Sequence, residues 1–303
     1  MMNAARLSVG LEGYAVSDRA YQQAAEWART RVQGKPPVPG INAPAPIIYH
    51  PDVKRMLLTM KSQIEALRAV AMYASLQLDL GARHPDAAIK AAAQTRGDLL
   101  IPVVKACSTE AGIELASLGV QIHGGMGFVE ETGAAQPYRD VRITTIYEGT
   151  TAIQSNDFIG RKLARDRGAA MGSLIADMRS ELATITPTGA ADVTAAVIES
   201  KAATLEAIDA LEFAVKSVLA ASAQGPERAL AVSVPALRLA GYVIGGWLLT
   251  KSAAIAARKL GESGADVDFL RGKLASARFY AGHILPQAHA LARVVSAGAA
   301  SVL

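Results

Sequence analysis

The 303-residue sequence contains a single cysteine and few aromatic residues, and each shortage excludes a class of protein. With Cys107 alone, neither an intramolecular disulfide nor a metal cage built from cysteines can form, which fits a reducing, cytoplasmic compartment. Aromatic residues make up 5% of the chain while alanine recurs throughout, a composition that favours helices and is short of strand-forming residues. We therefore expect an all-α protein.

Charge and long apolar runs are also scarce. The 31 Lys and Arg residues against 27 Asp and Glu residues leave a net charge of +4, which is too thinly spread to predict a nucleic-acid partner. The longest strongly apolar stretch without a charge, residues 239–250, is shorter than the ~20 residues that a membrane helix needs. Arg6 and Glu12 interrupt the first turns, so no secretory signal is indicated. We expect no membrane span.

Helical periodicity and the placement of proline and glycine indicate how the chain is organised. Apolar residues at helical spacing predict helices, the first two joined by a proline-rich crossover, over residues 4–31, 53–81, 86–124, 134–146 and 150–166. Breaks then separate about four further helical stretches, near residues 185–189, 224–226 and 261–264. We predict an up-and-down four-helix bundle over residues 1–166, followed by a helical C-terminal extension over residues 167–303.

Histidines and glycines give only weak signals when each is considered alone. None of the five histidines stands three or four residues from another, so we predict no metal site. The segment Gly124-Gly-Met-Gly-Phe128 follows a helix rather than a strand and lacks the third glycine of the G-x-G-x-x-G pattern, so it fits neither a dinucleotide-binding fingerprint nor a P-loop. Taken alone, it is better interpreted as a helix C-cap followed by a tight loop.

Three blocks within residues 121–154 change that interpretation. Gln121-Ile-His-Gly-Gly-Met-Gly-Phe128 is followed by Pro137-Tyr-Arg-Asp140, and then by Ile146-Tyr-Glu-Gly-Thr150 with Gln154. In this order and spacing, the blocks resemble the flavin- and active-site region of the acyl-CoA dehydrogenases. Residues 24–34 are similar to a second motif of the family, although the family's aromatic residue before Gly34 is absent.

The resemblance implies about half of such an enzyme. Residues 1–165 look like the family's C-terminal four-helix domain, and the remainder is similar in placement to the helical extension of its larger members. The family's N-terminal helical domain and central β-domain have no counterpart in this sequence. The resemblance therefore implies a homo-oligomer with an incomplete FAD site, which needs a separate chain carrying the missing domains for activity.

The same resemblance assigns roles to individual residues. Glu148 matches the catalytic base, which removes the α-proton of an acyl-CoA thioester while FAD takes the β-hydrogen as hydride. Arg31 and Gln33 would reach the FAD of a neighbouring subunit. The other expected contacts are to the adenosine end of FAD for Gln121, Gly124 and Gly125, to its pyrophosphate for Thr150, and to the substrate for Arg6 and Gly149.

Structural alternatives remain open for several of these residues. Glu148 would then be an ordinary carboxylate at a helix start, Arg31 a solvated cation at a helix end and Arg6 a surface arginine. We expect Arg139 and Asp140 to form a structural ion pair. For the whole chain, the alternative is a non-catalytic helical oligomerisation module. A DNA-binding relative would need a concentrated basic surface, which the sequence lacks.

Overall fold

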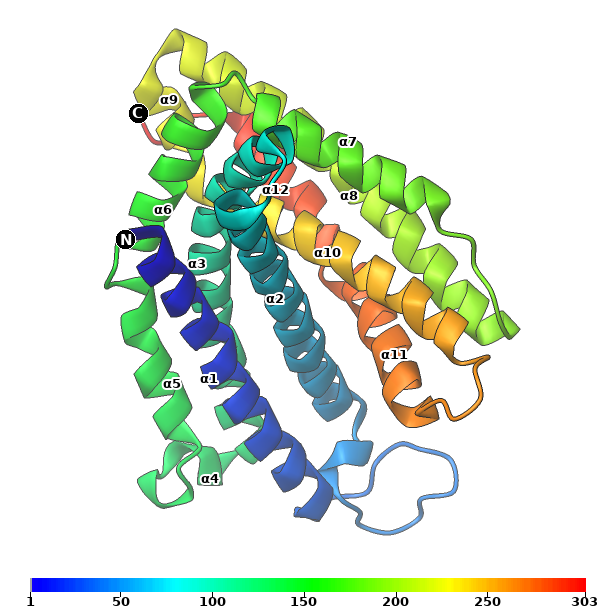
Figure 1. The fold of residues 1–303 in the computed structure, drawn as a ribbon. Coiled ribbons are helices and arrows are strands. Elements are labelled where there is room, and N and C mark those ends of the chain that lie inside the picture. Colours follow the sequence, from blue (N-terminus) through cyan, green and yellow to red (C-terminus); the bar gives the residue numbers. More distant parts are fainter. Residues whose placement is uncertain (1) are drawn as a thin grey trace.

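A computed structural model describes residues 2–303 as a molecule built from helices (Figure 1). These residues form no strand, and an isolated antiparallel bridge between Val32 and Pro46 closes the base of the crossover loop. The all-α prediction is confirmed.

The first part of the chain is an up-and-down bundle, as predicted. Helices α1 and α3 run parallel, and α2 runs antiparallel to both, which places Arg68 of α2 beside Asp18 of α1 at 2.8 Å. The fourth member of the bundle is divided into several short helices, from α4 to η4, and runs back along α3. The elements are α1 (Met2–Thr30), η1 (Ile47–Tyr49), α2 (Pro51–Arg83), α3 (Ala87–His123), α4 (Gly125–Phe128), η2 (Glu130–Thr132), α5 (Ala135–Val141), η3 (Arg142–Thr145), α6 (Thr151–Asp157) and the π-helix η4 (Phe158–Ala164).

Local sequence signals explain where α3 begins and ends. The Asp86 side chain accepts hydrogen bonds from the backbone N–H groups of Ala88 and Ile89, at 2.8 and 3.0 Å, and so caps the first turn. At the other end Gly124 adopts a φ of 63° as the C-cap. The predicted capping role of this glycine is confirmed.

Glycines let α1 and α3 approach until their backbones touch. A Cβ atom added to Gly13 would lie 2.6 Å from the carbonyl oxygen of Ser108, and one added to Gly112 would lie 3.0 Å from the carbonyl oxygen of Gly13. Side chains at these positions would push the helices apart. The close contact fixes the position of α1 relative to α3. It thereby also fixes the relative positions of the residues that these helices carry at both ends of the bundle.

The second part of the chain contains six helices where about four helical stretches were predicted. The additional breaks fall at residues 231–232, just before α10, and at residues 284–285, just before Pro286, which begins the last helix. The helices are α7 (Ala169–Thr184), α8 (Ala191–Gln224), α9 (Pro226–Leu230), α10 (Ser233–Lys259), α11 (Val267–His283) and α12 (Pro286–Ala297).

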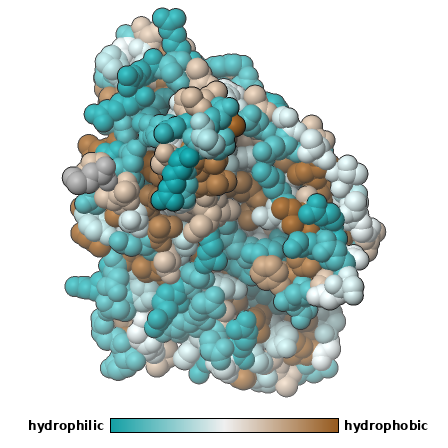
Figure 2. Space-filling model, viewed as in Figure 1, coloured by the Kyte–Doolittle hydropathy of each residue, from teal (hydrophilic) through white to brown (hydrophobic). Residues whose placement is uncertain are grey.

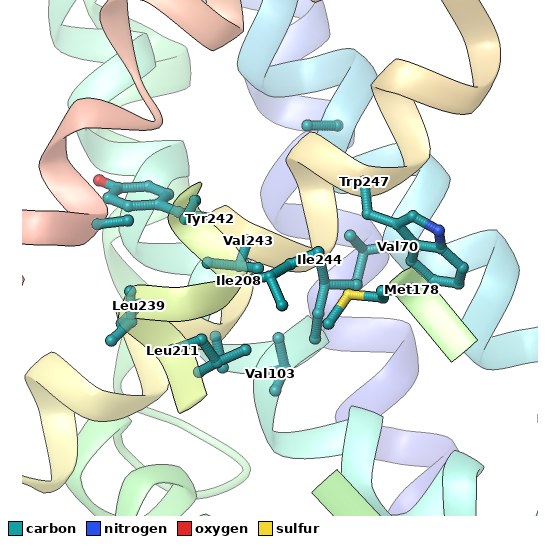
Figure 3. Packing of buried hydrophobic residues seen from close by; sticks show 14 of the residues in the cluster. Val70, Val103, Met178, Ile208, Leu211, Leu239, Tyr242, Val243, Ile244 and Trp247 are labelled. Atoms are coloured by element: carbon teal, nitrogen blue, oxygen red, sulfur yellow. The ribbon is translucent and has the colours of Figure 1, made fainter. Parts of the chain in front are cut away.

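Helix α10 forms the centre of the molecule. It packs against α2 and α3 of the bundle as well as α8, α11 and α12, and its Trp247 is completely buried (Figure 3). The helix is long and apolar enough to cross a membrane, with a mean hydropathy of 1.3, but 67% of that stretch is buried inside the fold. One apolar cluster therefore continues from the bundle into the extension, and a second lies within the bundle.

Candidate functional site

The structure separates the predicted site residues into two groups at opposite ends of the bundle (Figure 1). Arg6 lies near the start of α1, and its guanidinium bonds to Asp157 at the end of α6, at 2.9 Å. Arg31 directly follows the last residue of α1. At a rise of ~1.5 Å per residue, α1 places Arg6 and Arg31 about 37 Å apart.

Glu148 stands in a turn just before α6. Its φ of 53° and the φ of 92° at Gly149 put two consecutive residues in the left-handed region, which is uncommon for a residue with a side chain. Gln154 donates its side-chain N–H to the carbonyl oxygens of both residues, at 3.3 Å each. The carboxylate itself is exposed, so residues 2–303 do not surround it with the dry environment that a base of raised pKa needs.

Lys105, on α3, lies directly beneath this turn. Its ammonium group donates a hydrogen bond of 2.7 Å to the carbonyl oxygen of Gly149, and the residue is completely buried. It forms no ion pair with any residue in the described range 2–303. Burial lowers the pKa of Lys105 from 10.5 to about 8, against the opposing effect of Glu110. The turn is thus held by a lysine whose burial disfavours its charged form.

Arg6 and Tyr147 connect α1 to the same end of the bundle. The Arg6 side chain is only 13% exposed, so the surface-arginine alternative is wrong. Its partner Asp157 also lies 3.6 Å from Arg161. The Tyr147 hydroxyl donates a hydrogen bond to Glu12, and desolvation followed by this bond raises the pKa of Tyr147 to about 12. These contacts place the Glu148 turn against α1.

Thr150 begins α6 as the sequence predicts. Its hydroxyl oxygen accepts a hydrogen bond from the backbone N–H of Ile153, at 3.4 Å, which is the geometry of an N-cap. The neighbouring Thr151 donates its hydroxyl to Glu110 of α3. The free N–H groups at the start of α6 therefore stand beside Glu148 and Gly149, where they favour an anion.

The second group surrounds a hollow of about 420 Å³ at the far end of α1. Arg31, Gln33, Gly124 and Gly125 all line it. Arg31 donates a hydrogen bond to the Gln33 side chain at 3.1 Å. Gln121 is exposed one turn away and does not line the hollow.

The wall of this hollow is aromatic, and its glycine side is open. Trp27 and His123 stack with ring centroids 5.1 Å apart. A Cβ atom added at Gly124 or Gly125 would meet no atom within 4 Å. The backbone at these glycines therefore faces free space into which a ligand can fit.

Comparison with known proteins identifies the family. Residues 1–164 match the family described as "Acyl-CoA dehydrogenase, C-terminal domain", and residues 174–303 match "Acetyl-CoA dehydrogenase C-terminal like". This chain belongs to the acyl-CoA dehydrogenase family. The family match therefore includes every residue of both groups described above.

Similar proteins extend the comparison to most of the chain. It is 45% identical, over 96% of its length, to 3-methylmercaptopropionyl-CoA dehydrogenase of Ruegeria pomeroyi, and 32% identical, over 93%, to a broad-specificity linear acyl-CoA dehydrogenase of Mycobacterium tuberculosis. It covers 48% and 47% of those proteins, so the chain spans about half the length of the curated relatives it matches.

Solved structures share the fold of this chain. The crystal structure of Caenorhabditis elegans ACDH-11 in complex with C11-CoA matches with a TM-score of 0.72 at 20% identity, over 94% of this chain and 43% of that one. An acyl-CoA dehydrogenase from Bacillus anthracis complexed with FAD matches with a TM-score of 0.66 at 18% identity, over 97% and 48%.

Two features of this acyl-CoA dehydrogenase domain differ from the sequence analysis. The predicted ion pair between Arg139 and Asp140 is absent among residues 2–303, because adjacent residues on a helix point in different directions. Asp140 instead accepts a hydrogen bond from Gln136, one turn earlier, at 2.7 Å. Sequence reasoning also missed Lys105, although a lone charge within the apolar run of residues 99–106 was a usable signal.

Proposed function

We propose that this chain is the C-terminal portion of an FAD-dependent acyl-CoA dehydrogenase, with Glu148 as the base that removes the α-proton of an acyl-CoA thioester. The observation that carries the proposal is the turn at Glu148, fixed by Lys105 from below and by Gln154 at the side. Such a turn presents one carboxylate in a defined position, which proton abstraction requires. The similarity to two named acyl-CoA dehydrogenases over nearly the whole chain supports the substrate class.

The two groups of residues fit contacts to two different FAD molecules. Arg31 and Gln33 would reach the FAD of a neighbouring subunit, and the open backbone at Gly124 and Gly125 would hold its adenosine end, with Gln121 at the edge. At the other end, Thr150 and the start of α6 would face the pyrophosphate of a second. When bound, FAD would accept the hydride from the β-carbon of the substrate. Since about 37 Å separate the ends of α1, one chain would contribute to two sites.

The substrate would lie against the first group. In this proposal Arg6 and Gly149 would contact the substrate. Several apolar side chains near this turn are about half exposed: Ile143, Ile146 and Ile153. Figure 2 shows hydrophobic residues interrupting the hydrophilic surface on the face that it presents. We infer that the other half of such an enzyme covers this region and gives Glu148 the dry surroundings that a base needs.

The experiment replaces Glu148 in the reconstituted enzyme. When these residues are combined with the other half of such an enzyme, in one chain or two, we expect acyl-CoA dehydrogenation. Glu148→Gln keeps the shape and hydrogen-bonding capacity of the side chain but removes the base, so the rate should fall about 10²–10⁴-fold. FAD content and helicity should stay close to those of the unchanged chain.

A matched control and two outcomes separate the alternatives. Glu130→Gln, at an exposed carboxylate in η2, should keep full activity. A Glu148→Gln variant with more than about a tenth of the activity would show that Glu148 is not the base, because a lost general base costs more. Absence of any dehydrogenation by the unchanged pair would favour the non-catalytic oligomerisation module, which the exposure of Glu148 in this chain also fits.

A further inference from the structure

A cavity of about 130 Å³ lies between the bundle and the helical extension. Its volume is close to the ~150 Å³ of an engineered apolar cavity that holds benzene, so it has room for one ring-sized molecule. None of the predicted site residues lines it. The lining is mostly apolar or aromatic and comes from α2, α3, α10 and α11, with Thr151 of α6 at its edge; it includes Ala66, Val70, Ala106, Leu237, Tyr242 and Tyr280.

One polar side chain in the wall has no partner. Gln63 of α2 is 7% exposed and lines the cavity, and its amide makes no hydrogen bond to any residue between 2 and 303. Its amide atoms keep some accessible surface at the cavity, so a water or a bound molecule there can supply their hydrogen bonds. Gln63 therefore favours an occupant that offers it a hydrogen bond.

The charged side chains at the cavity differ in whether they have a partner of opposite charge. Arg238 is already engaged, by Glu114 and by the Tyr242 hydroxyl at 2.8 Å. Glu110 accepts the hydroxyl of Thr151 but forms no ion pair in the described part of the chain. Burial raises the pKa of the Cys107 thiol to about 12, so this part of the wall is neutral. The unpaired carboxylate disfavours an anion and favours a hydrogen-bond donor.

We propose that this cavity is a binding site for a small uncharged molecule with an apolar, ring-sized body and one hydroxyl group. The apolar body lies against Leu237 and Tyr242, and the hydroxyl group is the missing partner of Gln63. The proposal goes beyond the proposed dehydrogenation, because binding in this cavity requires no FAD and none of the predicted site residues lines it. Phenol has the size and the polarity of this ligand class and serves as the probe.

Two measurements on the full chain test the proposal. Phenol at ten times its Kd should raise the Tm by about 2–4 °C. Cys107, the single cysteine, lines the cavity, so the same concentration should slow its labelling by methylmercury about tenfold, as followed by mass spectrometry. Benzoate, which has a similar ring but carries a negative charge, should have neither effect.

Substitutions locate the bound phenol. Ala66→Leu and Ala111→Leu each fill the cavity and should remove both effects, and circular dichroism shows whether each variant is folded. Gln63→Leu should weaken phenol binding about fivefold, the value of one net hydrogen bond, and leave benzene binding intact. Ala92→Leu, at an exposed position on the same α3, should behave as the unchanged chain.

Three results would overturn the assignment. Cys107 labelling that phenol does not slow would show that the probe is not in the cavity. If Ala66→Leu, Ala111→Leu and the unchanged chain bound phenol with equal affinity, the binding site would lie elsewhere. A phenol-soaked crystal with only ordered water beside Gln63 would identify water as the partner of its amide.

Discussion

At the scale of single residues, the position of Glu148 depends on Lys105. The turn that carries Glu148 has an uncommon left-handed backbone, and the buried ammonium group of Lys105 binds its Gly149 carbonyl oxygen at 2.7 Å. A charged group is rarely buried completely without an ion pair. The hydrogen bond from Lys105 to the Gly149 carbonyl oxygen therefore offsets part of the free-energy cost of burying its charge, and it also stabilises the turn.

The lowered pKa of Lys105 predicts how stability depends on pH. Between a folded-state pKa of about 8 and the usual 10.5, the unfolded chain binds more protons at Lys105 than the folded chain does. The free energy of unfolding should therefore rise with pH across this range. Relative to Lys105→Met, the chain should gain about 2–3 kcal/mol between pH 7 and pH 10, as measured by urea unfolding.

Comparison with a second lysine isolates this effect. Lys90 is exposed on the same helix, so Lys90→Met should leave the pH dependence of stability unchanged. A constant difference between the unchanged chain and Lys105→Met from pH 7 to pH 10 would contradict the lowered pKa. The proposed clamp on the turn predicts, in addition, faster proteolysis at residues 146–150 in Lys105→Met.

The sequence located the motif residues but could not show what surrounds them. The capping positions of Thr150 and Gly124 follow from local patterns, because caps depend on nearby residues, whereas Glu148 is singled out by the family resemblance of its motif. The partners of Arg6 and Lys105 come from distant segments. Residues 99–106 are buried on every side of α3, so apolar spacing gave no face from which to place Lys105.

At the scale of helices, the contact between α1 and α3 should be sensitive to a single methyl group. In Gly13→Ala the new Cβ would lie 2.6 Å from the Ser108 carbonyl oxygen, and backbone cannot move aside as a flexible side chain can. We expect a loss of about 1–3 kcal/mol in the free energy of unfolding, measured in urea.

A glycine elsewhere provides the control for this substitution. A Cβ at Gly172, within α7, would meet no atom within 4 Å. Gly172→Ala should therefore raise stability by about 0.5–1 kcal/mol, because alanine loses less conformational freedom in a helix. Equal effects of the two substitutions would show that α1 and α3 are not in backbone contact.

Helix type was harder to predict than helix position. Long helices such as α2 and α3 begin and end close to the predicted residues, because proline, aspartate and glycine mark their ends. The predicted helix at 150–166 is instead an α-helix followed by a π-helix over Phe158–Ala164. Apolar periodicity does not distinguish these hydrogen-bonding patterns over so few residues.

At the scale of the whole molecule, the separation of the two groups of site residues predicts the behaviour of the purified chain. Each proposed FAD site has only some of its walls in this chain, and one chain would contribute to two sites. We expect a homo-oligomer by light scattering at micromolar concentration, with much less than one FAD per chain by absorbance. A monomer, or a stoichiometric yellow cofactor with turnover, would contradict this prediction.

The central position of α10 has a consequence for protein synthesis. This helix has the hydropathy of a membrane segment, yet α11 and α12, which help to cover it, follow it in the chain. At ~5–20 residues per second, the ribosome needs about 2–8 s to complete them after α10. Until α11 and α12 have been made and have docked, the face of α10 that they cover has no partner, and factors that bind apolar helices compete with folding for it. Rapid completion and docking of the last two helices therefore protects the protein from misdirection and aggregation.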